Sequence, residues 1–297
     1  MTPMERADVE FTSGGLRCAA WFYRPDVTDG DVPCVVMAHG MSLTRHDGLD
    51  RYAGILVAAG VAVLVYDHRY LGDSEGEPRQ RVQMSRQVQD RRSAIEFARR
   101  IDGVDPDRIV VWGYSFSGGS AAVAAAADPL VAGAILAFPF LDGLARAVVE
   151  VKSNLRNLAW FEGQVVKRLI GRSDRIPVTA EPGRRAVMVL PGEAHGFASL
   201  VASDSPWRNE VLAAPLAVEF MRRPVTKARK LHCPTLIQMG ERDISATRGP
   251  IEKFARRAPL AELRRYDLDH WQPFEFASAA EVAGDQVDWL LRNVVVR

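Results

Sequence analysis

Ser115 lies where an expected strand turns sharply into an expected helix. It follows an apolar run at residues 108–112 and precedes an alanine-rich run at residues 118–127. The first run predicts a buried strand, and the second predicts a helix. A serine at such a turn is lifted above the sheet, close to helix N–H groups that favour developing negative charge. The position therefore favours nucleophilic attack by the serine hydroxyl.

The residues two positions before and after Ser115 are small. Gly113 precedes it and Ser117 follows it, so the motif is Gly-x-Ser-x-Ser, with a serine where a second glycine is usual. Small residues are needed there because the strand and helix backbones pass close together. The alternative is an ordinary strand–turn–helix unit with an incidental serine.

A serine hydroxyl is a weak nucleophile, and it needs a base that a third group orients. Three histidines follow Ser115 in the chain, namely His195, His232 and His270. His270 comes after the last expected strand, residues 261–266, and so lies at the carboxyl end of a parallel sheet. We predict that His270 is the base. His232 precedes a strand, at the opposite edge of the sheet.

The orienting acid is expected after the strand that precedes the histidine. Asp243 follows the expected strand at residues 235–239 and is the predicted acid, with Glu241 ranked second. Asp142 is an alternative acid because it follows the strand at residues 133–138, where some proteins with a Ser-His-Asp site carry this group.

Acyl transfer also needs N–H donors for the oxyanion of the tetrahedral intermediate. One expected donor is the N–H of Phe116, the residue after the serine. The other is the N–H of Met41, in the loop after the strand at residues 34–38, where Gly40 permits a tight backbone. We expect His39 to brace this loop by hydrogen bonds.

Strand and helix patterns alternate along most of the chain. This order predicts an α/β fold with a mostly parallel, doubly wound sheet of about eight strands and helices on both faces. The expected strands are residues 9–12, 17–23, 34–38, 61–66, 108–112, 133–138, 235–239 and 261–266, and the expected helices are residues 49–59, 82–100, 118–127, 251–257 and 274–293.

The alternation breaks at residues 142–230. We interpret residues 1–141 and 231–297 as the core and residues 142–230 as an inserted helical lid, with helices at residues 154–170 and 212–221. Inserted at the carboxyl end of the strands, the lid would cover the site. Four aromatic side chains of the lid are predicted pocket walls: Trp160, Phe161, Phe197 and Trp207.

Composition excludes several function classes. Hydrophobic residues make up 47% and charged residues 25% of the 297, and the net charge is +1, which favours neither nucleic acid nor an anionic membrane as a partner. Paired arginines such as Arg91-Arg92 are expected on a solvated helix face. No run is apolar enough for a membrane span, and the polar N-terminus suggests a cytoplasmic protein. The three cysteines do not have metal-site spacing, and a homo-oligomer stays open.

Three segments together resemble a known family: YDHRYLGDSEGEPRQ at residues 66–80, WGYSFSGG at residues 112–119 and WRNE at residues 207–210. The chain resembles α/β-hydrolases, in a branch related to dienelactone hydrolases and X-Pro dipeptidyl-peptidase-like esterases that includes fungal polyketide transferases. In this branch the Ser-x-Ser-Gly-Gly form is normal. The resemblance implies Ser115, Asp243 and His270 as a catalytic triad, and an acyl-enzyme mechanism without metal or organic cofactor.

These observations predict a serine hydrolase that cleaves a small or medium apolar carboxylic ester or thioester. Three alternatives stay open because one fold hosts many reactions. The first is acyl transfer to an acceptor other than water in a polyketide or natural-product pathway. The second is hydrolysis of a C–C bond with the same triad, and the third is a non-catalytic ligand-binding protein.

Overall fold

An eight-stranded sheet forms the centre of the molecule. The computed structural model describes residues 6–26, 30–153 and 155–295, and the side chains of these except at 150–159, 161, 162 and 220. The first two strands form an antiparallel hairpin, and its second strand pairs antiparallel with the fourth strand of the chain. All other neighbouring strands of this sheet are parallel. In spatial order the strands are β1 (Arg6–Ser13), β2 (Leu16–Tyr23), β4 (Ala62–Tyr66), β3 (Val32–Ala38), β5 (Val104–Tyr114), β6 (Gly133–Ala137), β9 (Thr235–Gly240) and β10 (Ala261–Tyr266).

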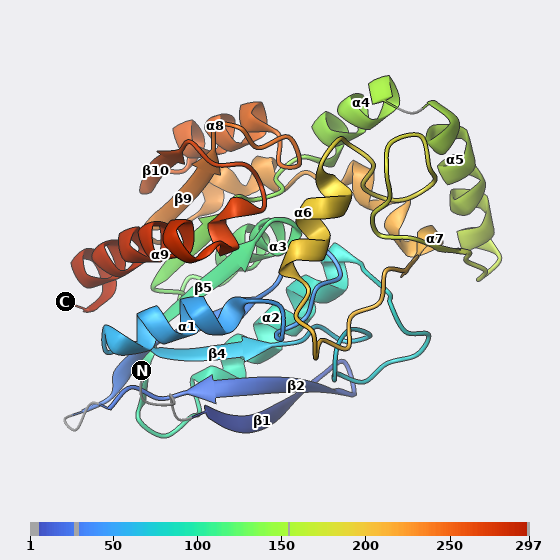
Figure 1. Cartoon of the computed structure of the whole chain (residues 1–297). Coiled ribbons are helices and arrows are strands. Elements are labelled where there is room, and N and C mark those ends of the chain that lie inside the picture. The colour runs from blue at the N-terminus through green and yellow to red at the C-terminus, as the bar shows by residue number, and fades with distance from the viewer. Residues whose placement is uncertain (1–5, 27–29, 154, 296–297) are drawn as a thin grey trace.

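Helices cover both faces of this sheet, which explains why its central strands are continuous apolar runs. Successive side chains of β3 point to opposite faces of the sheet, so Val36 and Val35 belong to two apolar clusters, each of which also contains residues of the helix layer on its own face. Figure 1 shows these two layers around the strands. The helices are α1 (Leu49–Ala58), α2 (Met84–Ala98), α3 (Phe116–Ala125), α8 (Arg248–Arg257) and α9 (Phe276–Leu290). The predicted doubly wound α/β fold is thus confirmed.

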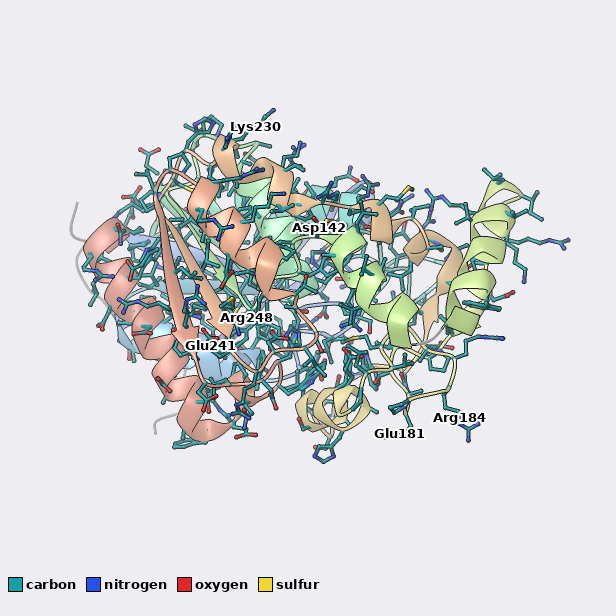
Figure 2. All side chains as sticks on the ribbon, turned by 90° about the horizontal axis from the view of Figure 1, so that it is seen from above. Asp142, Glu181, Arg184, Lys230, Glu241 and Arg248 are labelled. Carbon is teal, nitrogen blue, oxygen red and sulfur yellow. The ribbon has the colours of Figure 1, made fainter. Side chains whose placement is uncertain are left out.

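The chain between β6 and β9, here called the inserted segment (residues 142–230), forms a group of short elements beside the sheet. Figure 2 labels Asp142 and Lys230, at the two ends of the segment, close to the core. It labels Glu181 and Arg184 on the part of the segment that extends away from the core. Its elements are α4 (Gly143–Ser153), α5 (Leu155–Leu169), β7 (Arg175–Ile176), α6 (Glu193–Leu200), β8 (Val211–Leu212), α7 (Ala213–Leu216) and the 3₁₀ turns η1 (Glu219–Met221) and η2 (Pro224–Lys230).

The helix expected at residues 212–221 is wrong in extent. A single α-helical turn, α7, is followed by the separate 3₁₀ turn η1. In η1 the side chain of Glu219 points into the protein and accepts a hydrogen bond from the N–H of Met84. Two helices, α4 and α6, were not predicted. The side chain of Asp142 caps α4 by accepting hydrogen bonds from the N–H groups of Leu144 and Ala145. An aspartate is a common residue at the start of a helix, so this signal for α4 is present in the sequence.

None of the helices in the described ranges combines the length and the apolar character that crossing a membrane requires.

Candidate active site

The backbone at Ser115 holds a conformation that few residues other than glycine adopt. Ser115 joins β5 to α3 with φ +54° and ψ −121°, outside the usual regions for an L-residue. Its N–H donates to the carbonyl oxygen of Ala137 at 3.0 Å, which fixes the turn to the end of β6. The expected sharp strand-to-helix turn is therefore present, and it carries the hydroxyl at its tip.

Glycines permit the close approach of backbones around this turn. A Cβ at Gly113 would lie 2.3 Å from the carbonyl oxygen of Ser117, and one at Gly118 would lie 2.7 Å from Cβ of Pro139. A Cβ at Gly40 would lie 2.8 Å from Cβ of Ser115, so the loop after β3 packs directly on the turn. Each of these glycines is required by contact with rigid backbone or with a fixed ring.

Three side chains form a continuous hydrogen-bonded chain at the carboxyl end of the sheet. Nε2 of His270 lies 2.9 Å from Oγ of Ser115, and Nδ1 of His270 lies 2.7 Å from Oδ2 of Asp243. The other oxygen, Oδ1, accepts the N–H groups of Ser245 and Ala246, both at 2.8 Å. Because a carboxylate only accepts, Nδ1 carries the proton, and Nε2 is left as the acceptor for the serine hydroxyl.

The histidine loop after β10 is held by Tyr114, the residue before the serine. The hydroxyl of Tyr114 donates to the backbone carbonyl of His270. Burial raises the pKa of Tyr114, so this hydroxyl keeps the proton that it donates. The nucleophile strand and the histidine loop are thereby joined directly.

The loop after β3 brings a second N–H toward the serine. Met41 has φ +33°, and Phe116 is the first residue of α3, whose N–H the helix itself cannot bond. Within the described residues neither N–H donates to another protein group. The two expected oxyanion donors therefore belong to residues that line the same cavity as Ser115, and their N–H groups are unused within the described part of the chain.

His39 fixes the shape of this loop. Its Nδ1 accepts the N–H of Gly40 at 2.8 Å, and its Nε2 lies 2.8 Å from the carbonyl oxygen of Asp47, to which it donates. Burial lowers the pKa of His39 to about 4, so the ring is neutral with one fixed tautomer. This matches the expected bracing role.

Ser117 has a partner that the sequence did not reveal. Its Oγ accepts a hydrogen bond from Nη2 of Arg91, whose Nη1 donates to the carbonyl oxygens of Val36 and Trp112. Arg91 is fully buried, so its expected position on a solvated face is wrong. The signal was its spacing from Val88 and from other buried residues of α2, which places it on the apolar face.

The geometry does not favour the other candidate acids. Both oxygens of Asp142 are bonded by the guanidinium of Arg223, at 2.9–3.1 Å, and this carboxylate also caps α4. Glu241, directly after β9, forms an ion pair with Arg248 at the start of α8 at 2.8 Å, and Figure 2 labels both residues. Since Asp243 bonds His270 and Asp142 bonds Arg223, the geometry favours Asp243 over Asp142 as the orienting acid.

Two cavities meet at Ser115. The larger comprises about 540 Å³ of non-atom space, which includes open solvent at its mouth, and its walls are mostly apolar. It is lined by Met41, Ser115, Phe116, Phe140, Arg146, Val187, Met188, Leu216, Glu219 and Ser245. The smaller has about 230 Å³ and is lined by His39, Gly40, Met41, Leu43, Tyr114, Ser115, Met188, Phe197, His270 and Trp271. Residues of the inserted segment therefore contribute to the walls of both cavities.

Of the three predicted aromatic walls whose side chains the structure describes, only Phe197 lines one of these cavities. Trp207 packs behind it, with ring centroids 5.2 Å apart, and donates from Nε1 to Oγ of Ser42 at 3.1 Å. Trp160 lies in α5 beneath the guanidinium of Arg185 and lines neither cavity. The side chain of Phe161 lies outside the described residues. The walls Phe140 and Trp271 were not predicted.

Among the described residues, no cluster of three or more His, Cys, Asp or Glu side chains is arranged to hold a metal ion.

The strand order and the serine turn define an α/β-hydrolase. The solved structure of the α/β-hydrolase GrgF from Penicillium sp. sh18 matches with a TM-score of 0.83 and 23% identity, over 98% of this chain and 99% of that one. The structure of DcsB in complex with its substrate analogue matches with a TM-score of 0.82 and 21% identity, over 98% of this chain and 99% of that one.

The chain belongs to the serine aminopeptidase S33 family, whose model matches residues 32–271. It is 34% identical to the quorum-quenching protein AidA of Acinetobacter baumannii, over 99% of this chain and 97% of that one. It is 30% identical to the thiohydrolase aneE of Aspergillus aculeatus, over 84% and 80% of the two chains. A 140-residue match, 47% of each chain, is 41% identical to the polyketide transferase af380 of Aspergillus fumigatus. The expected hydrolase class and the likeness to fungal polyketide transferases are confirmed.

Proposed function

We propose that this α/β-hydrolase cleaves a carboxylic ester or thioester through an acyl-enzyme intermediate, with Ser115 as nucleophile, His270 as base and Asp243 as the orienting acid. The observation that carries the proposal is the hydrogen-bonded chain from Asp243 through His270 to Ser115. It ends at a hydroxyl held on a strained turn between two apolar cavities.

In the first half of the reaction, the Oγ of Ser115 attacks the carbonyl carbon while Nε2 of His270 takes its proton. The N–H groups of Met41 and Phe116 stabilise the oxyanion. His270 then returns the proton to the leaving alcohol or thiol. In the second half, water attacks the acyl-enzyme by the same route and releases the acid. Asp243 holds the imidazole tautomer throughout.

The walls around the serine support an apolar acyl group of small or medium size. Phe116, Phe140, Val187, Met188 and Leu216 line the larger cavity, and burial of such a chain would contribute binding energy through the hydrophobic effect. In this proposal the inserted segment is the lid of the site. The names thiohydrolase and polyketide transferase, carried by relatives, favour an acyl thioester.

Acyl transfer is the second candidate, because Ser115 also lines a second cavity. The smaller cavity, with Phe197 and Trp271 in its walls, could hold an acceptor while the larger one holds the acyl group. Relatives named polyketide transferase favour this variant. Product partition between free acid and transferred acyl group, measured with and without alcohol or amine acceptors, separates it from hydrolysis.

Covalent labelling with a fluorophosphonate, followed by intact-protein mass spectrometry, tests the proposal. We expect one adduct on the wild type, none on Ser115→Ala, and labelling slowed by about 100-fold or more in His270→Ala, because the base then no longer takes the hydroxyl proton. Ser120→Ala, one turn further along α3, is the matched control and is expected to label like the wild type. A folded wild type that forms no adduct would contradict the proposal.

A further inference from the structure

Glu219 is a buried carboxyl group in the wall of the larger cavity. It begins η1, near the end of the inserted segment, and only 3% of its surface is exposed. It lines the same cavity as Ser115, and most other walls of that cavity are apolar. A buried carboxyl in such surroundings is costly unless both of its oxygens find partners.

Only one oxygen of Glu219 has a partner. Oε2 accepts the N–H of Met84, at the start of α2, at 3.2 Å, and lies 3.7 Å from Nε of Arg222. Oε1 is buried and accepts no hydrogen bond from any residue that the structure describes. The hydrogen bond to the start of α2 therefore uses Oε2 and gives Oε1 no role.

A second buried carboxyl nearby shows what a purely structural role looks like. Oε1 of Glu193 accepts from Nη1 of Arg146 at 3.0 Å and from Oγ of Ser245 at 2.7 Å. Its Oε2 accepts from Nη2 of Arg146 at 3.2 Å and from the N–H of Leu190 at 2.9 Å. Both oxygens of Glu193 are fully used within the protein, in contrast to those of Glu219.

The charges around Glu219 leave both of its protonation states accessible. Burial raises its pKa to about 7, against the opposing effects of Arg222, the Met84 N–H and Arg168 of α5. Arg146 of α4 is the other charged group in the cavity wall, and it is bonded to Glu193. A hydroxyl group is the partner that fits either state, because it can donate to a carboxylate and accept from a carboxylic acid.

We propose that Glu219 selects acyl chains that carry a hydroxyl group, which it binds through Oε1 in the larger cavity. The inference rests on the proposed function in one respect, namely that this cavity holds the acyl group of a substrate bound at Ser115. A chain without the hydroxyl leaves Oε1 buried and unpaired, and sites built for such a hydrogen bond discriminate strongly against the analogue that lacks it. Glu219 is then a specificity residue for the acyl chain.

Glu219→Gln is the informative variant. The amide oxygen of Gln can still accept the N–H of Met84, so the start of α2 keeps its cap. The amide nitrogen then takes the position of Oε1 and presents donors to the cavity. We expect the preference to move from hydroxyl-bearing chains to chains with a keto group. Glu210→Gln is the matched control, since Glu210 lies in the inserted segment, pairs with Arg175 and lines neither cavity.

Binding to the Ser115→Ala protein tests the inference without turnover. Isothermal titration calorimetry compares methyl esters of one medium-length chain: unsubstituted, hydroxylated at each carbon in turn, and keto-substituted at the same carbons. We expect one hydroxy ester to bind about tenfold more tightly than the unsubstituted ester, a preference lost in Ser115→Ala/Glu219→Gln and kept in Ser115→Ala/Glu210→Gln.

Two results would overturn the inference: equal or undetectable binding of all the esters, or a hydroxyl preference that survives Glu219→Gln. Failure of the proposed function has a different signature, namely a folded wild type that forms no fluorophosphonate adduct. Hydroxyl-selective binding without an adduct would leave the selectivity inference standing and remove the catalytic proposal.

Discussion

At the scale of single residues, the serine turn depends on a cation beneath it. Arg91 donates to two backbone carbonyls, one on β3 and one on β5, and to the hydroxyl of Ser117 at the start of α3. Burial lowers the pKa of the Arg91 guanidinium, which shows the cost of keeping its charge away from water. The second serine of the Gly-x-Ser-x-Ser motif is therefore a ligand of this cation as well as a small residue.

This contact predicts different costs for two serines in one helix. Ser117→Ala removes an acceptor from a buried charge, whereas Ser120→Ala removes a neutral hydrogen bond from Oγ to the carbonyl oxygen of Ser117. We expect the free energy of unfolding to fall by about 2 kcal/mol for the first variant and by about 1 kcal/mol for the second. Urea unfolding measures both values. Equal losses would show that the guanidinium contributes nothing through Ser117.

Glu219 predicts a pH dependence of stability with a definite sign. Its folded pKa of about 7 is above the ordinary value of 4.5 because of burial, so the native state binds more protons than the unfolded state between these values. Stability is then fully present below pH 4.5 and is lost as the pH rises through about 7, by on the order of 3 kcal/mol in total.

Urea unfolding of the wild type and Glu219→Gln at a series of pH values isolates this contribution. The free energy of unfolding of the wild type should fall relative to that of the variant as the pH rises from about 5 to about 8. Parallel curves for the two proteins over this range would mean that Glu219 titrates normally in the folded state.

The sequence allowed the hydrogen-bonded group of Ser115, His270 and Asp243 to be predicted, but not the buried contacts around it. Ser115, Asp243 and His270 each follow a strand of a parallel sheet, and the ends of such strands meet at one edge. Arg91 and Glu219 act through partners that lie elsewhere in the fold, such as Met84, which is 135 positions from Glu219. No local pattern shows such a pairing, so these contacts appear only once the chain is folded.

At the scale of secondary structure, the sheet was easier to predict than the inserted segment. A parallel strand that is buried on both faces is apolar throughout, and all eight strands had such a run or an alternating pattern. The elements of the inserted segment are short, and they pack into a small apolar cluster with residues such as Leu43, Val82 and Phe116 of the core. Their boundaries are set by that packing more than by their own periodicity.

The helix α6 approaches the histidine loop through a glycine. A Cβ at Gly196 would lie 2.1 Å from Cδ1 of Trp271, the residue after His270. Gly196→Ala should therefore displace α6 or the Trp271 ring and widen the smaller cavity, with slower fluorophosphonate labelling and lower thermal stability. Gly284→Ala is the matched control, because Gly284 of α9 has no neighbour within 4 Å of a built Cβ.

Gly284→Ala should leave labelling unchanged and raise stability by about 0.5–1 kcal/mol, the usual gain for this change in a helix interior. The steric argument fails if Gly196→Ala behaves in the same way, since α6 would then have room for a methyl group beside Trp271.

At the scale of the whole molecule, a buried polar network joins the inserted segment to the site. Arg146 of α4 and Glu193 of α6 form an ion pair with 7% and 0% of their side chains exposed. The hydroxyl of Ser245 donates to Glu193, and the N–H of Ser245 donates to Asp243. The segment is thus connected to the loop that orients His270. A cytoplasmic location stays a prediction from the sequence.

This network predicts that Arg146 and Glu193 contribute to stability as a pair. Arg146→Met leaves the carboxylate of Glu193 buried without its cation, and loss of one member of a buried pair costs about 3–5 kcal/mol. The double variant Arg146→Met/Glu193→Met should lose less than the sum of the single variants, because no unpaired charge remains. Arg175→Met is the control, since its pair with Glu210 is partly exposed and should contribute less than about 1 kcal/mol. Urea unfolding of the wild type, the two single variants, the double variant and Arg175→Met measures these losses, with labelling rates as a second measurement. Additive losses in the double variant would mean that the two side chains contribute no coupling energy.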